Sequence, residues 1–380
     1  MSSSNTMQSM INRVLVVVLL VAIIAVLAVG FLKGRQDQAS VSQSPIDIAA
    51  ALGHFYMPAE FEPQELLFLS GEELVVNDPQ TMITIARALR GEVQVEILVG
   101  SAAGKSAVDS LLGAAGLASP AARPLRLPVQ SMWLRDFGPL TVTDVDGRRS
   151  MVEFRCGPRQ ASPQDNRLSA KLAVLLDLAI LSNQLQVDGG DLLSNGRGMG
   201  IMSARVVAGN AGYREKESEE IPHTVAAMLG FEKVVTVPAL RGEPSGHVDM
   251  FCAFLAADLL VVGSYEVGVD AENSAQLDQL AKEMAGLPTL AGPLRVVRIS
   301  LPNHTDGIWR SYTNVIMANG VVLVPIYPNY CPDLDAWALA FYRQHYPERN
   351  IVGVDASILA RQGGGLRGVT MNVPVGASLN

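Results

Sequence analysis

The sequence has few of the residues that form metal centres or disulfide frameworks. Three of its 380 residues are cysteines, at Cys156, Cys252 and Cys331, and five are histidines. The cysteines are widely spaced and form no Cys-x-x-Cys pair, and their odd number argues against a disulfide framework or a zinc site. We therefore expect neither a bound metal nor another cofactor.

Basic residues are also in the minority. The chain has 29 lysines and arginines against 37 acidic residues, a formal net charge of −8, and the acids are scattered along it. A nucleic-acid surface needs a concentrated basic stripe, so we expect no nucleic-acid partner. Charged residues make up 17% of the chain and hydrophobic residues 49%, with 34 glycines and 21 prolines. This composition predicts a large core and many turns.

One stretch lacks charge altogether. Residues 14–32 contain no charged or strongly polar residue, and this length is just sufficient for a helix to span a bilayer. Arg13 precedes the stretch and Lys33 and Arg35 follow it, so the positive-inside rule gives a weak orientation signal. The segment predicts a single-pass membrane anchor with the soluble domain outside the cytoplasm. A signal peptide cleaved near Ala28 is the alternative, and it would release a secreted protein.

The expected anchor at 14–32 divides the sequence into parts of different composition. A short tail, 1–13, precedes it, and residues 33–54, rich in Gln, Ser, Asp and Ala, form a polar linker. Residues 55–376 contain no low-complexity break and are expected to form one long domain. Residues 377–380 form a second tail.

Within the long domain a pattern recurs: a short apolar strand, a polar loop, and a second apolar strand, with helical stretches between. The spacing is loose, roughly 50 to 60 residues. Repeats start at Leu125, Leu185, Val234, Val297 and Ile351. The pattern predicts an α/β fold of sheet-and-helix blades around an axis, with the polar loops gathered at one end.

Two glycine-rich segments resemble phosphate loops, and each fails a test. GSAAGKSA, from Gly100, has three residues between its first glycine and Gly-Lys-Ser, whereas a P-loop needs four. GGGLRGVTMNVP, at 363–374, contains G-x-G-x-x-G, but the twelve residues after Gly368 are strand-like and include no helix. A dinucleotide fingerprint requires that helix and a second strand. The late glycines instead suggest close backbone approach to a shared centre.

Three loops carry polar residues among apolar neighbours. WLRDFGP contains Arg135 and Asp136, VDGGDLL contains Asp188, and SGHVDMF contains His247 and Asp249. The last two open an apolar run that predicts a strand, where residues two apart face the same side, so we expect them to point together. An Arg–Asp pair that fixes a turn, or a structural His–Asp hydrogen bond, is the simpler alternative.

If these residues do meet, their chemistry fits a guanidinium. A guanidinium presents five N–H donors in a planar fork, which pairs best with carboxylates held in its plane. Burial of that charge requires nearly complete pairing. The imidazole could carry protons. Hydrolysis at the guanidinium carbon would still need a nucleophile, normally an activated thiolate.

These motifs resemble the guanidine-modifying superfamily, in particular agmatine deiminases and bacterial peptidylarginine deiminases. YMPAEFEPQE, at 56–65, is similar to the opening motif of agmatine deiminases, and WLRDFGP to their Trp-x-Arg-Asp-x-Gly-Pro. VDGGD resembles their Glu-Gly-Gly segment and GHVD their Gly-His-Val-Asp. SYTNVIMANGVVLVPIY with YPERNIVGVD resembles the last third of the family. The similarity runs in order over about residues 55–375 and implies a five-bladed, pseudo-symmetric α/β propeller.

The resemblance also implies roles for individual residues. Asp136 and Asp249 would hold the guanidinium, and His247 would act as the acid and base. Asp188 stands where the family has Glu, which keeps the charge and shortens the reach by one methylene. Trp133, Arg135 and Arg367 would complete the substrate-binding wall.

The final motif departs from the family. Active members carry a glycine run, an aliphatic residue, His or Arg, and then the nucleophilic cysteine. Here Arg367 is followed by Gly368 at the position of the nucleophile. Glycine has no side chain, so the covalent reaction cannot start there. Cys331 lies on another loop, while Cys156 and Cys252 are interpreted as a loop thiol and a buried small hydrophobe.

Three hypotheses follow. The first is a membrane-anchored pseudoenzyme that binds a guanidino group, as agmatine, arginine or peptidyl-arginine. The second is an active deiminase that uses another route, either water attack assisted by His247 or Cys331 as the nucleophile. The third is a structural or interaction module with a vestigial site.

Overall fold

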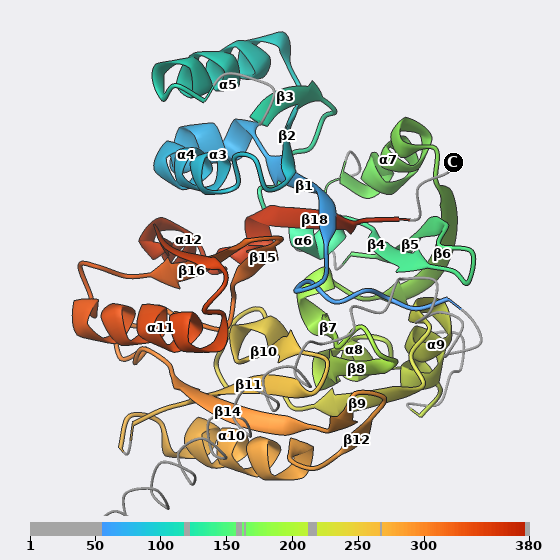
Figure 1. Cartoon of the computed structure of the whole chain (residues 1–380), viewed down its shortest axis with the longest axis vertical. Helices are drawn as coiled ribbons and strands as arrows, with labels where there is room; N and C mark the ends of the chain where they lie inside the picture. The colour runs from blue at the N-terminus through green and yellow to red at the C-terminus, as the bar shows by residue number, and fades with distance from the viewer. Residues whose placement is uncertain are drawn as a thin grey trace, which may run out of the picture. The chain divides into compact units, whose positions relative to one another are not determined.

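The computed structural model describes residues 55–117, 122–156, 162, 165–211, 219–266 and 268–376. The expected anchor at 14–32, the linker and both tails lie outside these residues. Among the residues described, no helix is both long and apolar enough to cross a membrane. The described residues form a mixed α/β fold, as the sequence predicts (Figure 1).

Five sheets in the described part of the chain share one strand pattern: the first strand is antiparallel to the second, and the second is parallel to the third. Their strands, in sheet order, are β18 (Thr370–Pro374), β1 (Gln64–Ser70), β2 (Gln94–Val99) and β3 (Ala122–Arg126); β4 (Leu140–Thr143), β5 (Arg149–Arg155) and β6 (Ala179–Gln186); β7 (Leu192–Ser194), β8 (Met199–Ser203) and β9 (Lys233–Val237); β10 (Cys252–Ala256), β11 (Leu259–Ser264) and β14 (Arg295–Ser300); β15 (Ile316–Ala318), β16 (Val321–Ile326) and β17 (Asn350–Asp355). A small hairpin pairs β12 (Pro288–Thr289) with β13 (Gly292–Pro293).

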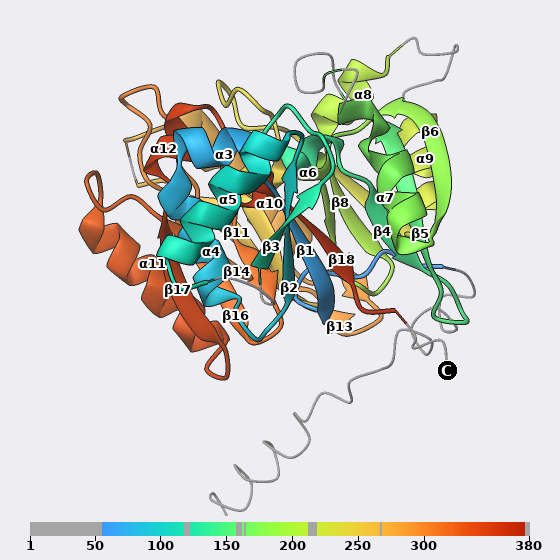
Figure 2. The same ribbon diagram turned by 90° about the horizontal axis from the view of Figure 1, so that it is seen from above.

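The predicted strand–loop–strand repeat is confirmed, but each copy connects two sheets. All five repeat starts fall in the last strand of a sheet: the fourth strand, β3, in the four-stranded sheet, and the third strand, β6, β9, β14 or β17, in the others. Each repeat then crosses a polar loop and enters the first strand of another sheet. The final crossing leads into β18, which pairs with β1 and so joins the two ends of the described chain (Figure 2).

The helices flank these sheets. They are α3 (Glu72–Asn77), α4 (Pro79–Ala88), α5 (Ala102–Ala114), α7 (Leu168–Leu176), α8 (Ala204–Gly209), α9 (Glu220–Leu229), α10 (Ala271–Met284), α11 (Pro332–His345) and α12 (Ser357–Arg361). Local sequence sets their starts: Asp78 accepts a hydrogen bond from the backbone N–H of Thr81 ahead of α4, with Pro79 at the first helical position. The largest hydrophobic cluster packs α4, α5 and α11 against β1, β2 and β16.

Four of the polar loops contain one short helical turn just before the next sheet. These turns are α6 (Leu134–Phe137), η2 (Gly189–Asp191), η4 (Val248–Met250) and η5 (Arg367–Val369), and a further turn, η1 (Asp165–Arg167), precedes α7. The prediction that His247 and Asp249 share one face of a strand is therefore wrong. His247 precedes a 3₁₀ turn and Asp249 lies within it, so the alternation of a strand does not apply.

Candidate functional site

The four short turns bring the predicted polar residues together. Turn α6 contacts both η5 and η2, and η2 contacts η4. Ionisable side chains from these turns and from two neighbouring segments, most of them buried, form what we call the polar cluster. It has two halves: the Asp188 half, consisting of Asp136, Asp188, Asp191, Arg205 and His247, and the Asp249 half, consisting of Glu60, Arg135, Asp249 and Arg367.

His247 lies between two carboxylates of the Asp188 half. Its Nε2 is 3.4 Å from Asp188 Oδ2, and its Nδ1 is 3.8 Å from Asp136 Oδ1. Burial alone would lower the pKa of this imidazole, but the carboxylates outweigh it, with Asp136 first, and raise the pKa to about 10. Gly190 allows the approach, because a Cβ there would come within 2.4 Å of the imidazole Nδ1. His247 is therefore a charged imidazolium near neutral pH.

The surroundings of Asp136 favour its neutral form, whereas those of His247 favour its charged form. Its carboxylate is buried, and burial raises its pKa; the nearby carboxylate of Asp188 adds to this and the His247 imidazolium partly offsets it, so the pKa is about 7. Within this half, a carboxyl whose pKa is raised by burial therefore lies 3.8 Å from an imidazole whose pKa is raised by the neighbouring carboxylates. Such a pair can hold or move a proton, which is the acid–base role predicted for His247.

Arg205, which the sequence analysis missed, supplies a guanidinium to the same half. It lies in the first turn of α8, and its Nε donates to Asp191 Oδ1 at 2.5 Å while its Nη2 donates to Asp191 Oδ2 at 2.8 Å. Nη2 also donates to Asp188 Oδ2 and lies 3.2 Å from His247 Nε2. Burial lowers the pKa of this guanidinium, but Asp191 and Asp188 overcome that effect and raise it. This is a bidentate pair of the strongest kind.

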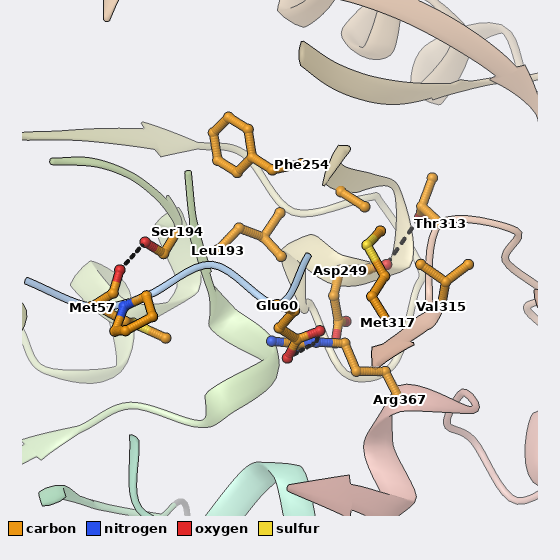
Figure 3. A pocket seen from close by; sticks show the side chains of 12 residues that line it. Met57, Glu60, Leu193, Ser194, Asp249, Phe254, Thr313, Val315, Met317 and Arg367 are labelled. Atoms are coloured by element: carbon orange, nitrogen blue, oxygen red, sulfur yellow. Dashed lines mark hydrogen bonds and ion pairs between the residues drawn. The ribbon is translucent and has the colours of Figure 1, made fainter. Parts of the chain in front are cut away.

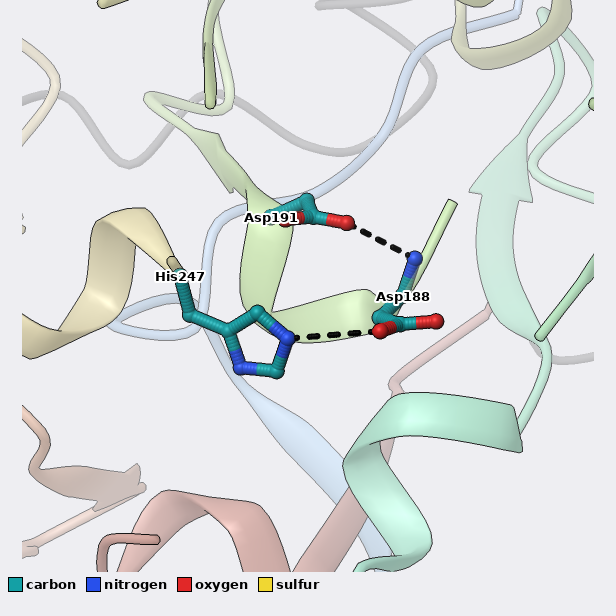
Figure 4. A group of neighbouring side chains, drawn as sticks. All are labelled: Asp188, Asp191 and His247. Atoms are coloured by element: carbon teal, nitrogen blue, oxygen red, sulfur yellow. Dashed lines mark hydrogen bonds and ion pairs between the residues drawn. The ribbon is translucent and has the colours of Figure 1, made fainter. Parts of the chain in front are cut away.

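The same acids and imidazole also have the geometry of a metal site. One ligand atom from each of Asp188, Asp191 and His247 falls within 4.8 Å of the others, and all three residues are buried (Figure 4). The cation at this point is the chain's own Arg205, whose donors already face these oxygens. In this arrangement the buried carboxylates are paired with a guanidinium.

The Asp249 half is held together by two further guanidinium groups. Arg367 Nη1 donates to Asp249 Oδ2 at 2.6 Å, and its Nε donates to Glu60 Oε1 at 3.0 Å. Arg135 Nη2 pairs with the same Glu60 oxygen at 2.9 Å (Figure 3 shows Glu60, Asp249 and Arg367). Burial raises the pKa of Glu60, but the two arginines outweigh it and lower the pKa overall. Burial and the charge of Arg367 lower the pKa of Arg135 to about 10.

Little free space remains beside Asp249. Its Oδ1 is buried and has no hydrogen-bond partner among the residues that the structure describes. The adjoining cavity, lined by Glu60, Asp249, Thr313, Arg367 and apolar side chains, has a volume of about 30 Å³. That volume accommodates about one water molecule. A guanidino ligand does not fit in this half as it stands.

Trp133 occupies the space next to the position of the expected nucleophile. A Cβ built on Gly368 would lie 2.9 Å from Trp133 Cε3, and one on Gly364 would lie 2.4 Å from Trp133 Cζ3 and Cη2. Two of the late glycines therefore allow the backbone to pack against an indole ring. The run of glycines predicts a close backbone approach here, and the partner is this ring.

The three cysteines differ in position. Cys252 is buried in a hydrophobic cluster, as expected. Cys331 contacts Tyr312 Oη at 3.3 Å and lines a different cavity of about 480 Å³, with Glu266, Asn303 and Asp333. Cys156 lies beside Asp188: burial first, then that carboxylate, which accepts a hydrogen bond from the thiol, raise its pKa. The thiol that touches the polar cluster is therefore Cys156, in its protonated form.

Comparison with known proteins identifies the family. The sequence model described as Porphyromonas-type peptidyl-arginine deiminase matches residues 56–374. The chain belongs to this family. A Streptomyces avermitilis protein with the provisional name agmatine deiminase is 25% identical over 349 residues, which cover 84% of this chain and 97% of that protein.

Solved structures of agmatine deiminases share the fold. The agmatine deiminase of Enterococcus faecalis is similar, with a TM-score of 0.70 at 18% identity, covering 88% of this chain and 98% of that chain. A cysteine-to-serine variant of C. jejuni agmatine deiminase with substrate bound has a TM-score of 0.72 at 16% identity, covering 85% and 97% of the two chains. The expected resemblance to deiminases is thus confirmed for family and fold.

The site residues expected from the sequence lie in or beside the polar cluster. Asp136, Asp188 and His247 meet in one half, and Arg135, Asp249 and Arg367 meet in the other. Their catalytic and substrate-binding roles stay predictions. Two of the missed residues had a signal: Glu60 lies in YMPAEF and Asp191 in VDGGD, both quoted for the resemblance. Arg205 lies in no such motif.

Proposed function

We propose that this family member binds a guanidino group through the Asp188 half of the polar cluster and does not hydrolyse it. The observation that carries the proposal is the guanidinium of Arg205, which is held by the carboxylates of Asp188 and Asp191 beside His247. A set of groups that accepts this guanidinium fits the same fork on agmatine, arginine or an arginine side chain.

The proposed lack of turnover rests on Gly368. Covalent deimination needs a nucleophile that attacks the guanidinium carbon while ammonia leaves. Gly368 offers no side chain, and Trp133 crowds the space where one would begin. The Cys156 thiol contacts the cluster, but its raised pKa keeps it protonated and weakly nucleophilic. C. jejuni agmatine deiminase has been solved with substrate bound as a cysteine-to-serine variant, which supports the idea that this fold can bind a substrate when a cysteine has been replaced.

Binding and turnover are tested separately. We expect agmatine, arginine or an arginyl peptide to raise the melting temperature at millimolar concentration, and we expect Asp188→Asn to abolish that shift. Putrescine and a lysyl peptide are the matched controls, since they offer ammonium groups without the planar fork. If none of the guanidino compounds changes the melting temperature, the binding proposal fails.

Turnover is assayed as ureido product from the same three substrates. We expect none from the wild-type protein. Measurable product would favour an active deiminase, and two variants would then locate its nucleophile: loss of product in Cys156→Ala implicates the thiol beside Asp188, and loss in Cys331→Ala implicates the more distant one. Product retained in both but lost in His247→Gln would indicate water attack.

Two broader features belong to the proposal. We infer that the five sheet units surround a common axis as a five-bladed propeller, supported by their shared strand pattern and by the pairing of β18 with β1 (Figure 1). We also infer that residues 14–32 anchor the chain in a membrane with the domain outside the cytoplasm, on sequence grounds alone. Membrane fractionation of the full chain, with deletion of 14–32 as the control, tests the anchor.

A further inference from the structure

We propose that Arg205 is an intramolecular guanidinium ligand, and that an external guanidino group enters the Asp188 half by displacing it. This inference rests on the proposed function, because it concerns the same carboxylates. It goes further because it names Arg205 as the group that competes with the ligand. This competition would set the affinity of the site and select guanidino ligands over amines.

The carboxylates of the Asp188 half are already paired with Arg205. Its guanidinium faces both oxygens of Asp191 and one oxygen of Asp188. An incoming ligand cannot simply add to this set, since the carboxylates already have a cation in their plane. Binding must therefore be an exchange of one guanidinium for another.

Arg205 reaches solvent, whereas the acids it pairs with do not. Its side chain is 34% exposed, and those of Asp188 and Asp191 are each 1% exposed. Arg205 therefore extends from the surface to the buried acids. Its aliphatic arm runs past the loop before His247, where a Cβ on Gly246 would lie 2.9 Å from Arg205 Cδ. Withdrawal of the arm would leave an opening with the outline of an alkylguanidinium.

Exchange of the Arg205 guanidinium for that of a ligand should cost little free energy. Leaving Asp188 and Asp191 without a cation would be costly, because both are buried. A guanidino ligand restores the same fork of hydrogen bonds, so the net cost of exchange is small. An ammonium is a compact point charge and cannot reproduce the bidentate geometry. Displacement of Arg205 thus favours guanidino compounds over amines.

The test uses the full chain with Arg205→Ala and ethylguanidinium as the probe. We expect the variant to bind ethylguanidinium at least roughly tenfold more tightly than the wild type, by calorimetric titration, because the internal competitor is gone. Ethylammonium is the control ligand. Arg241→Ala is the control variant, since Arg241 is an exposed surface arginine paired with Glu272; we expect it to bind like the wild type.

Two further variants keep the result interpretable. If Arg205→Ala does not fold, Arg205→Lys retains the charge without the fork and should still gain affinity over the wild type, by a smaller factor. Adding Asp188→Asn to either variant should remove the gain, which places the bound probe in the Asp188 half. No gain in either folded variant, or a gain that survives Asp188→Asn, would overturn the proposal.

The outcomes also separate this inference from the proposed function. Wild-type protein that binds no guanidino ligand, together with a gain in Arg205→Ala, would support Arg205 as an internal ligand but refute both binding in the native chain and displacement of Arg205 by an external group. Wild-type binding without a gain in affinity in the variants would support the proposed function. It would refute the claim that Arg205 competes with the ligand.

Discussion

In both halves of the polar cluster, arginines pair with buried carboxylates, but the arginines differ in their exposure to solvent. In the Asp249 half, Arg367 and Asp249 are each 3% exposed, and Glu60 connects that pair to a second arginine. In the Asp188 half, the acids are as deeply buried, but Arg205 reaches them from the surface. An arginine enclosed on all sides stabilises the fold, whereas one whose arm touches solvent can be replaced. The exposed arm, rather than the hydrogen bonds, distinguishes a structural arginine from a displaceable one.

The largest effect is expected in the enclosed half. Arg367→Ala should lower the free energy of unfolding by about 3–5 kcal/mol, because it leaves Asp249 and Glu60 buried without their main cation. Urea denaturation monitored by fluorescence measures this. Ethylguanidinium should not restore the loss, since the adjoining cavity of about 30 Å³ gives it no entrance. A loss below about 1 kcal/mol, the scale of a surface ion pair, would contradict the structural role.

A smaller loss is expected in the exposed half. Arg205→Ala should lower the free energy of unfolding by about 1–3 kcal/mol, less than Arg367→Ala, because water reaches part of its side chain. Millimolar ethylguanidinium should recover part of this loss, and ethylammonium should not. The same titration on Arg367→Ala is the matched control. Equal losses in the two variants, with no recovery in either, would remove the distinction between the halves.

Much of the fold was predictable because its signals are local. Apolar runs such as those of β8, β11 and β16 are buried throughout nearly their whole length, and polar loops separate them, so the repeat can be read along the sequence. The grouping of strands into sheets could not be read in this way. Each repeat spans two sheets, and the pairing of β18 with β1 joins segments about 300 residues apart in sequence.

The site was predictable to the extent that its residues lie in recognisable motifs. Asp136, Asp188, His247 and Asp249 do, and all four are buried in the polar cluster. Their partners were harder to predict, since an arginine on a helix is normally a solvated side chain. Nothing in the local sequence of Arg205 indicates that its guanidinium turns inward to two buried carboxylates. That placement depends on how η2 and α8 pack, which the sequence does not display.

The pH dependence of stability should differ between the halves, because the imidazole belongs to only one of them. The folded pKa of His247, about 10, is above the unfolded value of about 6.5. The contribution of His247 to the free energy of unfolding is therefore complete below about pH 6.5 and is lost as the pH rises toward 10. Unfolding free energies measured from pH 6 to 10 should fall in the wild type and fall less in His247→Gln. In Arg367→Ala the decline should persist, and an unchanged decline in His247→Gln would contradict this assignment.

The smallest effect on stability is expected at Gly368, which follows Arg367 and lies beside Trp133. Gly368→Cys should fold with a loss of about 1 kcal/mol, since its Cβ approaches Trp133 to 2.9 Å and the ring must shift slightly. Gly368→Ala introduces the same crowding without a thiol and serves as the control. The introduced thiol alone should give little ureido product, because Arg205 still pairs with the carboxylates.

Combining Gly368→Cys with Arg205→Ala should therefore raise turnover of agmatine, arginine or an arginyl peptide above that of either single variant. The gain would be more than additive, since one change supplies the nucleophile and the other vacates the place of the substrate. Product from Gly368→Cys that Arg205→Ala does not increase would show that a substrate reaches the thiol without displacing the internal guanidinium. Arg205 would then have a structural role, as Arg367 does.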